Sequence, residues 1–136
     1  MFLVDTNVIS ETTRRRPSPG VLGWLSRQER VLLSAVSLQE LAFGVEAAPE
    51  PRRALLEEWL TALLQNPSIE VVPLDRPAAL HAGRLLARSR ARGQALATTD
   101  AQIAGTALAC SAILVTRNTK DFASLGVPLL DPFAVE

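Results

Sequence analysis

The stretch Thr99–Thr116, TDAQIAGTALACSAILVT, joins a helical pattern directly to an apolar strand pattern. From Ala101 to Thr116 it carries no charge, with Asp100 and Arg117 at its two ends. This run is shorter than the roughly 18 to 20 residues that a membrane-spanning helix needs. It therefore predicts a buried helix that leads into a buried strand.

Outward from this unit, short apolar runs alternate with longer helical patterns. Helices are expected at residues 21–27, 37–46, 51–64, 78–92 and 99–110. Strands are expected at residues 2–4, 31–35, 69–74, 112–116 and 127–130. Such alternation predicts an α/β fold with a parallel sheet covered by helices on both faces. The carboxyl ends of the strands, where ligands bind in open α/β sheets, would lie along one edge.

Length and composition limit the function classes. A chain of 136 residues predicts one domain spanning residues 1–136, and the formal net charge of zero argues against a simple polycation that coats nucleic acid. Cys110 and His81 are single, which excludes a disulfide within the chain and any mechanism that needs two histidines; we assign His81 no role. Without a signal-peptide pattern, a soluble cytoplasmic protein is expected.

Four acidic residues stand near the expected ends of strands. Asp5 follows the first strand, Glu40 is expected in the first turn of the next helix, Asp100 opens a helix, and Asp121 follows the fourth strand. Each has a purely structural alternative: Asp5 as a helix N-cap, Glu40 as partner of Ser37 in a capping box, Asp100 as a dipole complement and Asp121 as a turn residue.

If the four acids meet, their repulsion determines the chemistry. Two carboxylates 4 Å apart repel by about 4 kcal/mol at an effective dielectric constant near 20, so protons or cations must neutralise some of them. Ligand sets made only of oxygen suit Mg²⁺ or Mn²⁺. Such an ion activates water for attack on a phosphoryl group, so the expected reaction class is metal-dependent phosphodiester hydrolysis.

Four motifs in order, together with the C-terminal segment, resemble PIN-domain toxins of the VapC type, in particular the FitB-like branch. The matching segments are MFLVDTNVISE at residues 1–11, SLQELAFGV at 37–45, TDAQIAGTA at 99–107, LVTRNTKDF at 114–122 and LDPF at 130–133. The resemblance implies a three-layer α/β/α sandwich with about five parallel strands. It also implies a Mg²⁺- or Mn²⁺-dependent endoribonuclease, the toxin of a type II toxin–antitoxin system.

The same resemblance implies the site residues and the partners. Asp5, Glu40, Asp100 and Asp121 would form the catalytic and metal-binding cluster. Asp5 and Asp100 would bind the metal directly and Glu40 through water, while some family members place the fourth acid where Asn118 stands. Asn7 and Thr116 would be supporting polar residues. The family implies an RNA substrate, a homodimer and a small antitoxin that blocks the site.

Some further groups have two interpretations. Arg14, Arg15 and Arg16 are candidate RNA contacts because they lie close to Asp5 in the sequence. The stripe of Arg84, Arg88 and Arg92 is either a solvated helix face or an RNA contact, and the face of Leu55, Trp59 and Leu63 is either core or a groove for a partner.

Two competing functions remain open at this level. One is a PIN-like protein that binds without cutting and represses together with a partner. The other is a phosphoacceptor signalling domain, which would need paired acids after the first strand and an acceptor after the third; here Asp5 stands alone and only Asp75 follows the third strand.

Overall fold

A computed structural model describes residues 1–134 of the chain. Five strands form one parallel sheet in the order β3-β2-β1-β4-β5. The strands are β1 (Phe2–Val4), β2 (Val31–Ser34), β3 (Ile69–Val72), β4 (Ile113–Val115) and β5 (Leu129–Leu130). This order places β1 in the centre, next to β4. The carboxyl ends of these two strands, which lie nearest the expected site, are therefore neighbours.

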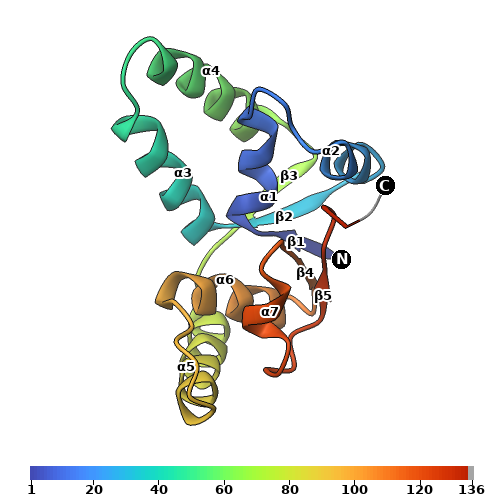
Figure 1. Ribbon diagram of the computed structural model, residues 1–136, viewed down its shortest axis with the longest axis vertical. Coiled ribbons are helices and arrows are strands. Elements are labelled where there is room, and N and C mark those ends of the chain that lie inside the picture. The colour runs from blue at the N-terminus through green and yellow to red at the C-terminus, as the bar shows by residue number, and fades with distance from the viewer. Residues whose placement is uncertain (135–136) are drawn as a thin grey trace.

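Helices lie on both faces of this sheet (Figure 1). They are α1 (Thr6–Ser10), the 3₁₀ turn η1 (Glu11–Thr13), α2 (Pro19–Ser26), α3 (Ala35–Ala47), α4 (Arg52–Gln65), α5 (Arg76–Ala91), α6 (Thr98–Ala109) and α7 (Thr119–Phe122). One layer contains α1, α2 and α4, and the opposite layer contains α5, α6 and α7. The expected three-layer α/β/α sandwich is confirmed.

Alternating side chains of each strand supply the two halves of the core. Leu3 and Leu114 pack with α5 and α6, whereas the next residues, Val4 and Val115, pack with α1, α2 and α4. All four side chains are fully buried. Because both faces of the sheet are buried, polar and apolar residues do not alternate along these strands.

The packing of α6 against α5 depends on Gly105. A Cβ atom at this position would lie 2.6 Å from the carbonyl oxygen of Ala78 and 2.7 Å from the amide nitrogen of Ala82. Only glycine therefore allows the two helix backbones to approach so closely. This contact matters for the site because Asp100 lies in the first turn of α6.

The start of α3 differs from the expectation. The helix begins at Ala35, and its N-cap is Ser34, whose hydroxyl accepts a hydrogen bond from the amide of Val36 at 3.0 Å. Ser37 is buried inside the helix, so the predicted capping box of Ser37 with Glu40 is wrong, and Glu40 lies beyond the first turn. Within residues 1–134 no helix is both long and apolar enough to cross a membrane.

Candidate active site

Asp5 is fixed between the first strand and the first helix. Its amide donates to the carbonyl oxygen of Val115 at 2.8 Å, and its Oδ1 accepts from the Thr6 amide at 2.7 Å as the N-cap of α1. Its Oδ2 accepts from the hydroxyl of Thr116 at 2.7 Å and from Nδ2 of Asn7 at 3.1 Å. The side chain is thus both a helix cap and a rigidly held acid, so the structural and functional interpretations are compatible.

The pKa of Asp5 is raised above its ordinary value. Burial is the main cause, since the residue is only 4% exposed, and the charge of Glu40 adds to it. The hydrogen bonds from Thr116, Thr6 and Asn7 act in the opposite direction but do not compensate fully. Asp5 is therefore a carboxylate that needs a nearby positive charge.

Glu40 reaches the same place from α3. The hydroxyl of Thr6 donates to its Oε1 at 2.7 Å and also lies 2.9 Å from the Ser37 hydroxyl oxygen. Thr6, which had no expected role, therefore positions Glu40 together with Ser37, which was expected only as a helix cap. Thr6 thus holds two of the four acids, because its amide donates to Asp5 and its hydroxyl to Glu40.

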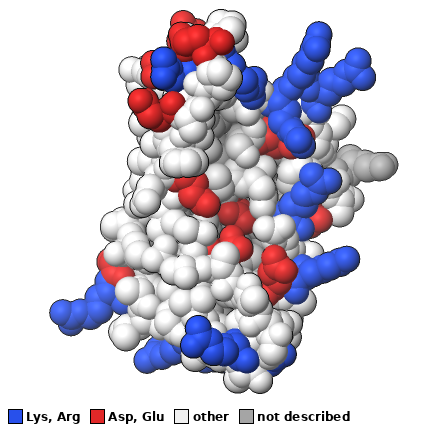
Figure 2. All heavy atoms as spheres, turned by 60° about the vertical axis from the view of Figure 1, so that its left-hand side comes forward, with Lys and Arg blue, Asp and Glu red and all other residues white. Residues whose placement is uncertain are grey.

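Asp100 shows that the four acids converge. Its pKa is raised from the ordinary 3.8 to about 6, mainly by burial and in addition by the charges of Asp5, Glu40 and Asp121. Four segments distant in sequence thus place carboxylates within mutual electrostatic reach. We call Asp5, Glu40, Asp100 and Asp121 the acidic cluster; acidic side chains gather near the middle of the face in Figure 2.

The fourth position has two neighbouring polar residues. Asp121 lies in the short helix α7 with an exposed side chain, and Asn118 is the N-cap residue of that helix. Asn118 contacts the site through its main chain, whose amide donates to the Thr116 hydroxyl at 3.0 Å. The carboxylate that acts on Asp100 at this end of the cluster is that of Asp121.

Asn7 and Thr116 link the strand ends of the site. Nδ2 of Asn7 lies 3.3 Å from the Thr116 hydroxyl oxygen, and Oδ1 of Asn7 accepts from the Arg117 amide at 3.2 Å. Thr116 is fully buried. Together they hold Asp5, Thr116 from 111 residues away in the sequence and Asn7 from two residues away.

Arginines line two separate pockets on the surface. Arg14, Arg15 and Arg16 are exposed and line a shallow pocket of their own, and Arg14 pairs with the buried Glu11 at 3.5 Å. A second pocket next to Asn7 is lined by Arg14, Arg52, Arg117 and Phe133 among others. Sequence reasoning missed Arg52, for which no local pattern exists, and Arg117, which its position directly after Thr116 could have indicated.

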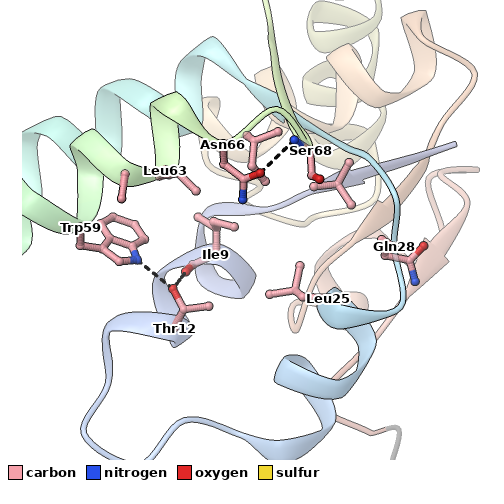
Figure 3. A pocket seen from close by; sticks show the side chains of 11 residues that line it. Ile9, Thr12, Leu25, Gln28, Trp59, Leu63, Asn66 and Ser68 are labelled. Carbon is pink, nitrogen blue, oxygen red and sulfur yellow. Dashed lines mark hydrogen bonds between the residues drawn. The ribbon is translucent and has the colours of Figure 1, made fainter.

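An apolar pocket of about 300 Å³ lies between α1, α2, α4 and the edge of β2 and β3 (Figure 3). Nε1 of Trp59 donates to the Thr12 hydroxyl at 3.0 Å, which fixes α4 over the end of α1. Leu63 is buried and Trp59 half-buried, whereas Leu55 is 64% exposed. The helix face of Leu55, Trp59 and Leu63 is thus partly core and partly open surface.

Comparisons with known proteins identify the family of the chain. The family model described as "PIN domain" matches residues 2–127, so the chain belongs to the PIN-domain family. Within it, the chain is similar to the plasmid stability protein StbB of Pseudomonas syringae pv. tomato, with 38% identity over 98% of this chain and 99% of that protein. It is also similar to the VapC ribonuclease Y4jK of Sinorhizobium fredii, with 34% identity over 98% of each chain.

A solved structure extends the likeness to three dimensions. The crystal structure of FitAcB from Neisseria gonorrhoeae superposes with a TM-score of 0.89 at 32% identity, covering 99% of this chain and 100% of that chain. The expected resemblance to VapC and FitB proteins is thereby confirmed.

Proposed function

We propose that this protein is a metal-dependent endoribonuclease, the toxin of a toxin–antitoxin pair, that hydrolyses RNA phosphodiester bonds. The observation that carries the proposal is the convergence of four carboxylates, expressed in the pKa of about 6 for Asp100. A cluster of this kind is a common sign of a functional site. The similarity to a VapC ribonuclease supports RNA as the substrate.

The donor set of the acidic cluster fits Mg²⁺ or Mn²⁺. All four members offer carboxylate oxygens, and their mutual repulsion would be relieved by a divalent cation. Within residues 1–134, no three His, Cys, Asp or Glu side chains are grouped so that they could hold an ion together. Mg²⁺ uses one or two carboxylates and keeps several waters, so two direct carboxylate ligands would suffice for it.

Asp5 and Asp100 would hold the ion directly, Glu40 through water, and Asp121 would add charge at the exposed end. When bound, such an ion polarises a phosphoryl oxygen and makes a bound water more acidic. The protein's own residues do the positioning. Thr116 and Asn7 fix the Asp5 carboxylate, and the hydroxyl of Thr6 fixes that of Glu40.

An Asp5→Asn variant tests this function. Asparagine can still cap α1 but lacks the charge, so Mn²⁺-dependent RNA cleavage and growth arrest on expression are expected to disappear. The matched control is Asp75→Asn, because Asp75 caps α5 in the same way, accepting from the Ala78 amide at 3.1 Å, and is outside the acidic cluster. Full cleavage by Asp5→Asn would refute the proposal.

If instead the wild-type protein binds RNA but cleaves none with Mn²⁺, the alternative of a non-cleaving, repressing PIN protein is favoured. The phosphoacceptor alternative has less support, because the charges that act on Asp100 are those of Asp5, Glu40 and Asp121 and not that of Asp75. Labelling of Asp75 by an acyl-phosphate donor would support it.

The partner that we propose is a small antitoxin, whose apolar segment would occupy the pocket of Figure 3 beside Trp59. Ala62 lines this pocket with an exposed side chain, so Ala62→Glu places a charge there without disturbing the core. We expect this variant to arrest growth like the wild type but to escape rescue by the small protein encoded beside it. Equal rescue of both would exclude the pocket as the antitoxin contact.

We also propose that the protein forms a homodimer, as the VapC resemblance implies. Phe43 on α3, a large apolar side chain that is 75% exposed, is a candidate contact of this dimer. Light scattering of the purified protein measures the mass, and a monomer at micromolar concentration would contradict this proposal.

A further inference from the structure

A pocket of about 330 Å³ adjoins the acidic cluster and is basic in character. Three arginines from separate parts of the chain line it: Arg14 follows η1, Arg52 begins α4, and Arg117 follows β4. In sequence they are more than 30 residues apart from one another, so only the fold brings them together. Figure 2 shows basic side chains projecting along one margin of the face that carries the central acidic side chains.

Asn7 forms the shared wall between this pocket and the acidic cluster. Its Nδ2 donates to Oδ2 of Asp5 at 3.1 Å, and its Oδ1 accepts from the main-chain amide of Arg117 at 3.2 Å. A group bound in the pocket would therefore lie one side chain away from the acid at the centre of the site.

The positive charge of the pocket is only partly balanced. Arg14 pairs with Glu11, which is 7% exposed and also accepts from the Ser18 amide at 2.8 Å. In the described part of the chain, Arg52 and Arg117 form no ion pair. With three arginines against one glutamate, two positive charges remain available to a ligand.

The Arg117 guanidinium is already positioned. It lies 4.6 Å from the centroid of the Phe133 ring, in the geometry of a cation–π contact. Stacking on a ring leaves the edge of the guanidinium free, and this edge matches the spacing of phosphate oxygens. Arginine in such an arrangement suits an anion with paired oxygens, such as a phosphate, better than a neutral group.

We propose that this pocket is a phosphate subsite, which binds a backbone phosphate of the RNA strand next to the bond that is cut at the acidic cluster. The proposal rests on the proposed function, because it takes the acidic cluster as the place of cleavage. The positive charge of the subsite offsets the repulsion between the four acids and the RNA backbone. By holding one phosphate, the subsite also determines which phosphodiester bond reaches the acidic cluster. Its ligand chemistry, a phosphodiester, is shared with free phosphate, so the test separates the two.

The test measures binding of a fluorescently labelled single-stranded RNA by anisotropy in EDTA, over a range of salt concentrations. The variants are Arg52→Gln, Arg117→Gln and the two combined, at exposed positions where the fold is not at risk. Each lost phosphate contact should reduce the slope of log K against log salt by about 0.7. With Mn²⁺ present, the double variant should raise KM several-fold and leave kcat nearly unchanged.

Arg53→Gln is the matched control. Arg53 is the next residue of α4 and loses the same charge, but its Nε pairs with Glu50 at 3.3 Å and it does not line the pocket. Arg117→Lys provides a second comparison, because it keeps the charge and removes the planar group over Phe133. We expect it to be weaker than the wild type and stronger than Arg117→Gln.

Three outcomes would overturn the subsite. The double variant could match Arg53→Gln in affinity and salt slope while the wild type binds and cleaves RNA, in which case the proposed function stands without the subsite. Inorganic phosphate could bind the wild type and not the double variant while both bind RNA with equal affinity and salt slope, which would assign the pocket to free phosphate. Loss of antitoxin binding with unchanged RNA binding would assign it to a protein partner. A wild type that neither binds nor cleaves RNA defeats the proposed function itself.

Discussion

Asp5 and Glu40 are held by hydroxyl and amide groups of the protein, whereas Asp100 and Asp121 come from helices on the other face of the sheet. Both oxygens of Asp5 and one of Glu40 accept hydrogen bonds. Within residues 1–134, the carboxylates of Asp100 and Asp121 accept none. The first pair is therefore positioned by a polar network, and the second pair by the packing of the helices that carry it.

This difference separates two tasks of the acidic cluster. The network fixes one side of the site before any cation arrives, in the manner of the hydrogen-bonded residues that orient metal ligands in other proteins. The less constrained side carries Asp100, whose pKa is raised to about 6 by burial and by the charges of the other three acids, so a cation that neutralises those charges would lower it. Three changes can break or sharpen this contrast.

The largest effect is expected from removing the hydroxyls of the polar network. Thr116→Val and Thr6→Val release Asp5 and Glu40, respectively, from bonds of 2.7 Å. Loss of such orienting contacts typically reduces metal affinity or activity 10- to 100-fold. We expect that reduction in Mn²⁺-dependent RNA cleavage for each variant, measured under single-turnover conditions.

Thr106→Val is the control for these exchanges. Its hydroxyl is also buried, but it donates to the Gln102 carbonyl of its own helix at 2.7 Å and not to an acid. Cleavage by this variant should equal that of the wild type. If all three variants lose activity alike, the polar network has no special part in positioning.

The next effect concerns the helix packing that carries Asp100. In Gly105→Ala, the added Cβ would clash with the backbone of α5 at Ala78 and Ala82, so α6 must shift. Overpacking of this kind typically destabilises a protein by about 1 to 3 kcal/mol. Urea unfolding should show that loss in free energy of unfolding, together with weaker Mn²⁺ binding.

Gly83→Ala provides the comparison for this prediction. Gly83 lies in α5, and a Cβ there would meet no atom within 4 Å. This exchange should stabilise the protein slightly, because alanine is the better helix former. A Gly105→Ala protein as stable as Gly83→Ala would show that α5 and α6 adjust freely.

The sequence predicted the sheet well because its strands are buried on both faces and are therefore continuously apolar. The four acids were expected at one edge of the sheet, and the charges of Asp5, Glu40 and Asp121 do act on Asp100, although Glu40 lies inside α3 and not in its first turn. The start of α3 was misplaced because Ser34 and Ser37 both precede a helical pattern, and only the tertiary fold buries Ser37 inside the helix.

The supporting contacts could not be predicted from local patterns. The hydroxyl of Thr6 reaches Glu40 across 34 residues, and Thr116 reaches Asp5 across 111 residues. The same holds for the meeting of Arg52 with Arg117 beside Asn7. Each of these pairs depends on how strands and helices are ordered in space, which spacing along the chain does not encode.

The smallest effect is the pH dependence of stability without metal. The folded protein holds the pKa of Asp100 near 6, whereas the unfolded chain has the ordinary value of 3.8. Between these values the folded state binds more protons, so the free energy of unfolding falls as pH rises from about 4 to 6 and then levels off. Asp5, whose pKa is also raised, acts in the same direction.

Urea unfolding in EDTA at several pH values measures this dependence, and Asp100→Asn isolates the part due to Asp100. Because Asp100 is partly exposed, we expect the variant to be more stable than the wild type at pH 7 by only about 1 kcal/mol, and by less at pH 4. Saturating Mg²⁺ should stabilise the wild type and remove most of this advantage, because a cation neutralises the same repulsion. A wild type that is equally stable at pH 4 and pH 7 in EDTA would mean that the charge of Asp100 and Asp121, on the less constrained side of the acidic cluster, does not destabilise the fold. That side would then differ from the hydrogen-bonded side only in geometry.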